Sequence, residues 1–163
     1  MQTINFPNPN ELKKHKSRLE KTLNVKIQIN NKEATIEGQG IEEYEASIVL
    51  EAMAFGFSAD KALQLQNQDM IFRIIPIKAL TRRKNLEEVR SRIIGKKGKT
   101  KETIQEIADC DLILNNNEVG LICHAENSEE ATAALTNLIK GSKQTNVYRY
   151  LESGNRKRKK EQL

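Results

Sequence analysis

The sequence predicts an α+β protein built from two tandem modules, in each of which helices cover one face of a three-stranded sheet. Three observations predict this fold. The chain repeats itself at an offset of 85 residues, short β-branched segments alternate with helical patterns, and a glycine pair separates two helices in the second half. With 163 residues, the chain has room for one medium domain or two small ones.

The internal repeat pairs residues 25–37, VKIQINNKEATIE, with residues 110–122, CDLILNNNEVGLI, without a gap. Between residues 10 and 56, nine of 47 positions are identical to their partners, and most other apolar positions stay apolar. A match of this kind indicates two related modules. The second module is more complete, because the positions that the offset pairs with its first strand would lie before residue 1. A shortened strand at residues 3–6 is expected to replace it.

The second module is predicted to run strand, helix, glycine turn, helix, strand, strand, helix. Its strands are β-branched, and its helices carry apolar residues on one face. Asn85 and Glu88 form a capping pattern at the start of the first helix, and Gly95 and Gly141 end helices. In order, the expected elements cover residues 70–77, 85–94, 95–98, 99–108, 111–115, 118–125 and 128–140.

Positive charge is concentrated in two places. Residues 82–101 carry nine Lys or Arg against two Glu, and the segment RKRKK at 156–160 adds five cations, whereas the rest of the chain has a net charge of −7. This distribution is typical of a protein that binds a polyanion. A solvated lysine face is the alternative, but it does not explain why the cations surround a glycine pair.

The glycine pair lies in the segment RIIGKKGKTKETI. Because Gly95 and Gly98 lack a Cβ atom, a phosphodiester chain can approach the main chain closely. The helix that follows directs free N–H groups toward the phosphates, and Lys96 and Lys97 add charge. The order of elements around this GxxG resembles a type I KH domain, whose GxxG loop clamps four nucleotides of RNA. A plain connecting turn is the alternative.

The first module lacks this clamp. The offset places Asn10 and Lys13 opposite the two glycines and Glu11 opposite Lys96. We therefore expect a truncated, degenerate KH-like module that serves as a scaffold or docks a protein. The expected boundaries are residues 1–65 for the degenerate module, 66–151 for the intact KH domain with its GxxG at 95–98, and 152–163 for a basic tail.

Three stretches resemble the archaeal form of the Partner-of-Nob (Dim-two) family: GFSADKALQL at 56–65, RSRIIGKKGKTKETIQEI at 90–107 and VYRYLE at 147–152. These are KH proteins of ribosome biogenesis. The resemblance implies binding of single-stranded RNA near the 3′ end of precursor small-subunit rRNA, in support of its endonucleolytic processing. It also implies the Nob endonuclease and the alpha subunit of translation initiation factor two as partners. The chain departs from the family in lacking a GxxG-like loop in its first module.

The resemblance gives the RNA role to the glycine turn and its neighbours, and bases are expected to lie over the apolar wall of Ile93, Ile94, Ile104 and the strand 111–115. Near the C-terminus, aromatic and guanidinium groups either stack on unpaired bases or pack against the second module. Three alternatives stay open for the basic tail: it contacts phosphates, serves as a nuclear localisation signal, or is a disordered end. The candidate RNA-binding residues are Arg90, Arg92, Ile93, Ile94, Gly95, Lys96, Lys97, Gly98, Lys99, Lys101, Ile113, Tyr148 and Arg149.

No catalytic constellation stands out, so we expect a binding protein and not an enzyme. His124 follows Cys123 but has no further ligands nearby for a zinc site, and we expect Cys110 and Cys123 to pack in the core. No cofactor, metal or small-molecule substrate is expected. A protein adaptor that docks a nuclease or the initiation factor subunit, with only incidental RNA contact, is the alternative function.

The expected location is the cytoplasm. The two cysteines lack CxxC spacing, which favours a reducing compartment. The N-terminal segment MQTINFPNPN lacks the features of a secretory signal, and no apolar run approaches the roughly 20 residues that span a bilayer. No membrane association is therefore expected.

Overall fold

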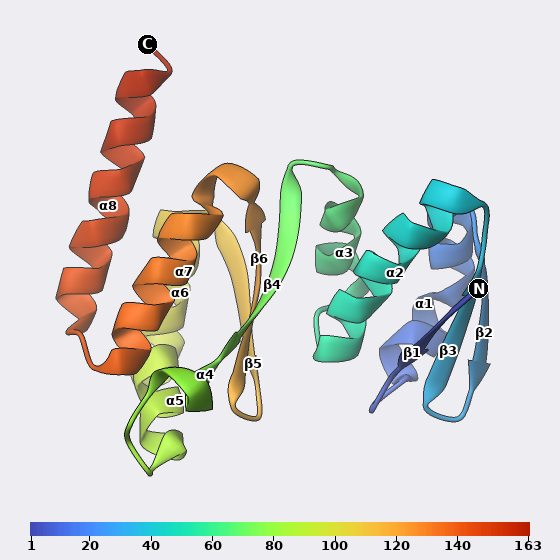
Figure 1. Cartoon of the computed structure of the whole chain (residues 1–163), viewed down its shortest axis with the longest axis horizontal. Helices are drawn as coiled ribbons and strands as arrows, with labels where there is room; N and C mark the ends of the chain where they lie inside the picture. The colour runs from blue at the N-terminus through green and yellow to red at the C-terminus, as the bar shows by residue number, and fades with distance from the viewer. The chain divides into compact units, whose positions relative to one another are not determined.

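The computed structural model describes residues Met1 to Leu163. It divides into two units, Met1–Phe72 and Arg73–Leu163, which are labelled by element in Figure 1. The three strands of the first sheet lie in the order β1-β3-β2, and those of the second in the order β4-β6-β5. Both sheets therefore have their last strand in the centre. No helix combines the length and the apolar character that crossing a membrane requires.

Unit 1 forms its sheet from short strands whose alternate residues point into the core. Leu12, Leu19 and Leu23 share one face of the first helix and are buried against it. Ile27 pairs with Ile36 across the antiparallel strands, and both are buried. The elements are β1 (Gln2–Asn5), α1 (Asn10–Leu23), β2 (Lys26–Asn30), β3 (Glu33–Glu37), α2 (Gly40–Phe55), α3 (Ala59–Ala62) and a 3₁₀ turn (Leu63–Gln66).

Unit 2 contains the predicted strands and helices in the predicted order, with two helices that the sequence analysis did not predict, α4 and α8. The boundaries of the expected elements agree with the structure to within three residues. Its elements are β4 (Met70–Pro76, which begins in the last residues of unit 1), α4 (Ile77–Leu80), α5 (Leu86–Ile94), a 3₁₀ turn (Lys96–Gly98), α6 (Lys99–Ala108), β5 (Cys110–Asn115), β6 (Glu118–His124), α7 (Ala125–Lys140) and α8 (Gln144–Glu161).

Local interactions explain where these elements begin and end. The side chain of Asn85 accepts a hydrogen bond from the Glu88 amide at 3.3 Å, which confirms the predicted cap of α5. Gly141, with φ 117°, ends α7, as predicted. Asn116, with φ 53°, makes the tight turn between β5 and β6.

Three features differ from the sequence-based expectations. The segment 57–69 contains α3 and a 3₁₀ turn, which no periodic pattern had indicated. Beyond the expected end of the first module at residue 65, the first compact unit continues to Phe72, whose ring centroid lies 5.9 Å from those of Phe55 and Phe57. Most of the basic tail is the end of α8, so it is helical and not a disordered end.

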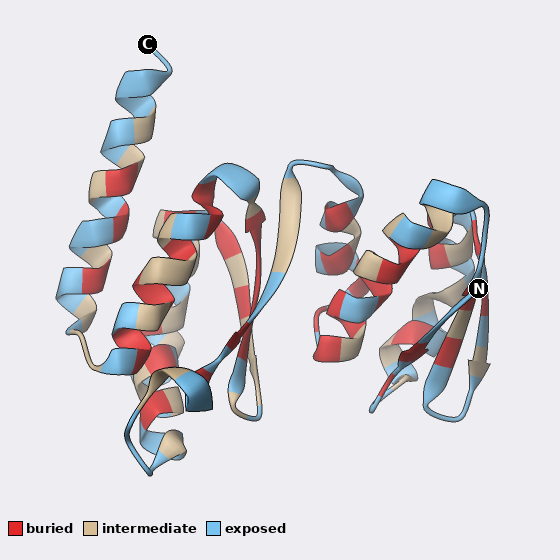
Figure 2. Ribbon diagram, viewed as in Figure 1, coloured by how far each residue is buried: buried red, intermediate tan, exposed pale blue.

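The end of α8 is held against unit 2 by specific contacts. Asn155 donates a hydrogen bond to the Ile107 carbonyl at 2.7 Å, and Arg158 forms an ion pair with Glu130. Gly154 is buried beside Glu130, where a Cβ atom would lie 2.6 Å from the carboxylate carbon. Figure 2 shows the buried residues of α8 on the side of the helix that faces α7. These contacts explain why the helix continues into a segment with such a high positive charge.

Cys110 and Cys123 are directly opposite each other on β5 and β6, and both are buried free thiols. Burial raises the pKa of Cys110 from 9.0 to about 12, and Cys123, Asp111 and Asp109 add to this effect. Burial also raises the pKa of Cys123 to about 11, against a smaller lowering by Arg73. Both thiols are therefore protonated and poorly nucleophilic at neutral pH.

We expect iodoacetamide at pH 8 to modify neither thiol until the protein unfolds. The free energy of unfolding should also fall as the pH rises from about 9 toward 11, because thiols of the unfolded chain ionise there while those of the folded chain stay protonated. Mass spectrometry of the adducts and urea titrations at several pH values measure both effects. The double variant C110A/C123A should lose this part of the pH dependence. Rapid labelling of the native protein would contradict the assignment.

Candidate functional site

The turn between α5 and α6 has an unusual backbone. Gly95, Lys97 and Gly98 have φ values of 77°, 55° and 76°. The Gly98 amide donates a hydrogen bond to the Gly95 carbonyl at 3.2 Å, which closes the turn. Since left-handed conformations are favourable chiefly for glycine, this turn requires glycine at its two ends.

The two glycines meet different surroundings. A Cβ atom on Gly95 would lie 2.6 Å from both the backbone nitrogen and the Cβ atom of Thr100, so this glycine allows α5 and α6 to meet closely. A Cβ atom on Gly98 would meet nothing within 4 Å. Gly95 is therefore required by the packing of unit 2, whereas Gly98 leaves open space beside the main chain.

Four lysines lie in this turn or in the first residues of α6. Lys96, Lys97 and Lys99 are exposed, and Lys101 is partly exposed. None of these side chains forms a hydrogen bond or an ion pair with the rest of the chain. The positive end of the α6 dipole lies at the same turn. Unpaired positive charge beside an accessible main chain is suited to a phosphodiester chain, since an anion gains both charge and hydrogen-bond donors there.

The two arginines of α5 are engaged by the fold itself. Arg92 donates from Nη1 to the Leu138 carbonyl at 3.1 Å and from Nη2 to the Ser142 carbonyl at 2.6 Å, at the C-terminal end of α7. Arg90 donates to the Asn116 carbonyl in the β5–β6 turn at 3.2 Å. These two residues therefore hold α5 to the end of α7 and to the β5–β6 turn. Sequence analysis missed this role, because Arg92 is 46 and 50 residues from its partners and no local pattern links them.

The expected apolar wall is only partly accessible. Ile93 and Ile104 have no exposed surface, whereas Ile94 is 40% exposed. Ile113, on the edge strand β5, is partly exposed. The assignment of Ile93 as an RNA contact is therefore corrected: its side chain packs in the core because it lies on the inner face of α5. Ile94 and Ile113 are the members of the expected wall that a base can reach.

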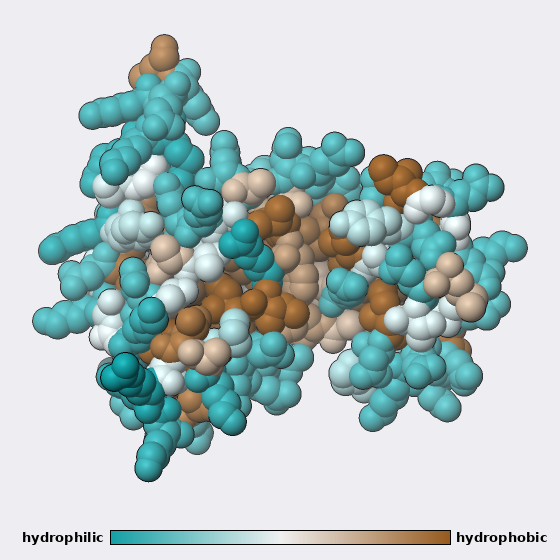
Figure 3. Space-filling view, in the orientation of Figure 1, coloured by the Kyte–Doolittle hydropathy of each residue, from teal (hydrophilic) through white to brown (hydrophobic).

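The C-terminal candidates are on α8, which packs against α6 and α7. Tyr148 is partly buried and Arg149 is exposed, and neither is hydrogen-bonded to the glycine turn. Arg158 of the basic segment is paired with Glu130, whereas the four other cations of this segment are exposed. Figure 3 shows hydrophilic side chains gathered along α8. The structure thus places a second cationic surface on this helix, separate from the glycine turn in sequence.

Replacement of the two glycines should have unequal costs. We expect Gly95→Ala to lower the free energy of unfolding by more than about 2 kcal/mol, because the left-handed backbone and the contact with Thr100 both oppose a side chain. Gly98→Ala should cost only about 1 kcal/mol, for the backbone alone. Urea titration of both variants gives the comparison. Equal costs would show that the close approach to Thr100 is not what requires Gly95.

Arg92 should be important for stability even without a ligand. We expect Arg92→Ala to cost about 1–3 kcal/mol, since two carbonyls at the end of α7 lose a charged donor. Arg92→Lys should restore less than half of this, because an ammonium group does not bridge both carbonyls as a planar guanidinium does. Arg90→Ala is the matched control and should cost less, since it removes one exposed hydrogen bond. Urea unfolding without RNA measures the free energy of unfolding of all three variants. An Arg92→Ala variant as stable as the parent would contradict a stabilising role for the two bonds of Arg92.

Comparison with known proteins identifies the family. The family model for the second KH domain of PNO1, described as a eukaryotic-type KH domain (KH-domain type I), matches residues 71–156. The KH domain-containing protein MJ0443 from Methanocaldococcus jannaschii is 26% identical over 152 residues, which cover 89% of this chain and 67% of that protein. The chain spans 56% of the RNA-binding protein PNO1 of Oryzias latipes, with which it is 28% identical.

Solved structures show the same likeness over almost the whole chain. Dim2p from Pyrococcus horikoshii has a TM-score of 0.85 and 27% identity, with 93% of this chain and 98% of that chain covered. The a/eIF2alpha–aDim2p–rRNA complex from the same organism contains a match with a TM-score of 0.83 and 27% identity, covering 99% of this chain and 94% of that chain. Since the family model spans more than half of the sequence, including the glycine turn, the chain belongs to the PNO1/Dim2 family of KH-domain proteins.

Proposed function

We propose that this protein binds single-stranded RNA and acts in small ribosomal subunit assembly, near the 3′ end of precursor small-subunit rRNA. Its role there is to assist endonucleolytic maturation in the cytoplasm without catalysing the cut itself. The observation that carries the proposal is the turn at Gly98, where open space adjoins the main chain and the neighbouring lysines have no partner. A strand of RNA supplies the phosphates that such a site is suited to bind.

The comparisons support the choice of RNA and of partners. The P. horikoshii complex contains rRNA and a/eIF2alpha together with aDim2p. We propose the corresponding partners for this chain, namely precursor small-subunit rRNA and the alpha subunit of initiation factor two. The Nob endonuclease is proposed as a further partner on the family resemblance alone.

We propose that unit 1 is a degenerate KH-like module that serves as a scaffold or docks a protein. The two units share strand order, and left-handed residues recur at equivalent places, Asn24 with Asp109 and Asn31 with Asn116. In unit 1, however, residues 10–13, which the offset pairs with the glycine turn, form the first turn of α1, and no helix corresponding to α5 precedes them. Unit 1 therefore lacks the glycine turn, and the module boundaries of 1–65, 66–151 and 152–163 remain part of this proposal.

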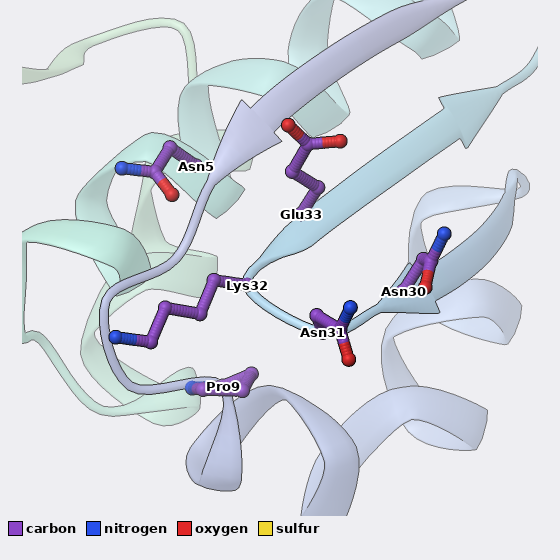
Figure 4. Close-up of a pocket in the computed structure, with 6 residues that line it drawn as sticks. All are labelled: Asn5, Pro9, Asn30, Asn31, Lys32 and Glu33. Atoms are coloured by element: carbon purple, nitrogen blue, oxygen red, sulfur yellow. The ribbon is translucent and has the colours of Figure 1, made fainter.

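A pocket in unit 1 supports the same distinction. It has a volume of about 770 Å³ and lies between the loop that precedes α1 and the β2–β3 turn. Figure 4 shows the Lys32 side chain extending alongside the loop that leads to Pro9. Lys32 and Glu33 are its charged lining residues, and Asn5, Asn30 and Asn31 supply amides. With its charges balanced, this pocket lacks the net positive charge that binding of phosphates requires.

We expect the double variant K96D/K97D to lose at least about 100-fold in RNA affinity, if each charge-assisted hydrogen bond is worth about 1.5 kcal/mol. The slope of log K against log salt should become shallower by about 1.4, at about 0.7 for each phosphate that is no longer neutralised. Fluorescence anisotropy with a labelled RNA from the 3′ end of small-subunit rRNA measures both quantities. The fold should persist, because both side chains are exposed on the turn.

The double variant K13D/K14D is the matched control. It makes the same change of net charge at exposed lysines of α1, which the offset pairs with the end of the glycine turn and the start of α6. Its RNA affinity should stay within a fewfold of the parent, because the proposal places no phosphate contact on α1, and a charge that makes no direct contact is screened over about 8 Å at physiological salt. If K96D/K97D binds as well as the parent, the clamp assignment fails.

The alternative is a protein adaptor whose contact with RNA is incidental. The observation that favours it is an exposed apolar pair at the start of α2, where Ile41 is 65% and Tyr44 is 60% exposed. An adaptor should bind the initiation factor subunit or the nuclease equally well with and without the K96D/K97D change. Its affinity for RNA should also be weak in the parent. Tight RNA binding that depends on the lysines excludes this alternative.

A further inference from the structure

A further cationic site lies in unit 2, where the segment that precedes α5 meets the C-terminal end of α7. A surface pocket of about 390 Å³ is lined by Leu80, Thr81, Arg82, Arg83 and Lys140. Three of these five residues are cations. The two arginines precede α5, and Lys140 is the last residue of α7, so three-dimensional structure alone brings them together.

The pocket is built on a fixed segment of chain. The Arg83 amide donates to the Thr81 hydroxyl at 3.2 Å, and the Thr81 amide donates to the Ile77 carbonyl at 3.2 Å. The guanidinium Nη2 of Arg83 is 3.7 Å from the position of a Cβ atom on Gly141, which brings it to the C-terminal end of α7. The backbone that carries these arginines is therefore positioned by folded structure, which reduces the entropy that an anion would have to remove.

The simplest role for these cations is to neutralise the negative end of the α7 dipole. Other groups already satisfy that end of the helix. Arg92 donates to the carbonyls of Leu138 and Ser142, and the amides of Gly141 and Ser142 donate to the Asn137 carbonyl at 3.1 and 2.9 Å. The dipole therefore does not account for the charge in the pocket.

Most of this charge has no partner in the protein. The side chains of Arg82 and Lys140 form no hydrogen bond or ion pair. Arg83 is paired with Glu88 at 3.1 Å, in an arrangement that is about half exposed on both sides. The pocket consequently keeps a net positive charge. A pocket of unit 1 has the opposite character, because Glu20, Glu37 and Glu42 outnumber the single cation in its lining.

We propose that the pocket of Arg82, Arg83 and Lys140 binds a phosphodiester group of the same RNA strand that the glycine turn clamps. This inference rests on the proposed function. The nine residues of α5 rise about 1.5 Å each, so roughly 14 Å separates the two ends of the helix. A stacked strand advances about 3.4 Å per nucleotide and covers this distance in about four nucleotides. The pocket thus holds the RNA beyond the four nucleotides of the clamp.

The test compares RNA of two lengths with the double variant R82Q/K140Q, which removes no bond of the fold. The probes are a strand of about 12 nucleotides from the 3′ end of small-subunit rRNA and its central four nucleotides. The longer strand should bind the variant about tenfold more weakly than it binds the parent at 0.15 M salt, and the slope of log K against log salt should be shallower by about 1.4. The short strand should bind as it does to the parent.

Two further variants identify the cause. Glu88→Gln, which frees Arg83, should strengthen binding of the longer strand but not of the shorter one. If the Arg83–Glu88 ion pair only stabilises the fold, the variant should instead be less stable, with unchanged RNA affinity. The double variant K14Q/K21Q is the matched control, because Lys21 occupies the last turn of α1 as Lys140 does in α7. It should leave both affinities unchanged.

The outcomes separate this inference from the proposed function. If K96D/K97D weakens both strands and R82Q/K140Q weakens neither or both equally, the clamp stands and the pocket assignment is overturned. If K96D/K97D weakens neither, the proposed function itself fails. Inorganic phosphate should bind the pocket only weakly and should compete with the longer strand. Phosphate that binds there without competing would show a separate anion site and would also overturn the assignment.

Discussion

The close approach of Gly95 to the first turn of α6 is the constraint on which the site depends. Because the position has a left-handed backbone and no room for a side chain, the chain reverses within a few residues and α6 starts at once. The reversal exposes the main chain at Gly98 and directs the positive end of α6 toward it. A wider turn would separate the lysines from the helix end, and the site would lose its combination of charge and accessible backbone.

Arginine and lysine have different tasks around this turn. The arginines of α5 use their planar guanidinium groups to bind carbonyls at the end of α7 and in the β5–β6 turn. The lysines have no such partners and present their charge to solvent. The fold thus uses bidentate groups where geometry matters, and compact, mobile charges where a flexible polyanion is to be bound. At the end of α7, Arg92 likewise binds carbonyls, whereas Lys140 and Arg82 have no partner in the protein.

The two units share a strand order but differ in the segment that could bind a phosphate. Both have the third strand in the centre of a three-stranded sheet, with a left-handed asparagine in the turn before it. Unit 1 has no helix corresponding to α5 and no glycine turn, because α1 begins at Asn10; the lysines of α1 therefore lie along a regular helix and not around a pair of glycines. The difference explains why we place RNA binding in unit 2 and docking or support in unit 1.

The sequence by itself determined the order of the three strands and of α5, α6 and α7 in unit 2, the cap at Asn85 and the position of the glycine turn, because these depend on interactions between residues close in the chain. It also showed the local excess of positive charge. Only the tertiary structure decided which side chains of that segment are free and what lies beside them: Arg92 bonds to carbonyls 46 and 50 residues away, Ile93 is enclosed by the core, and Lys140 of α7 lines one pocket with Arg82 and Arg83. Such long-range contacts follow from how helices pack, and side-chain periodicity alone does not specify which surfaces meet.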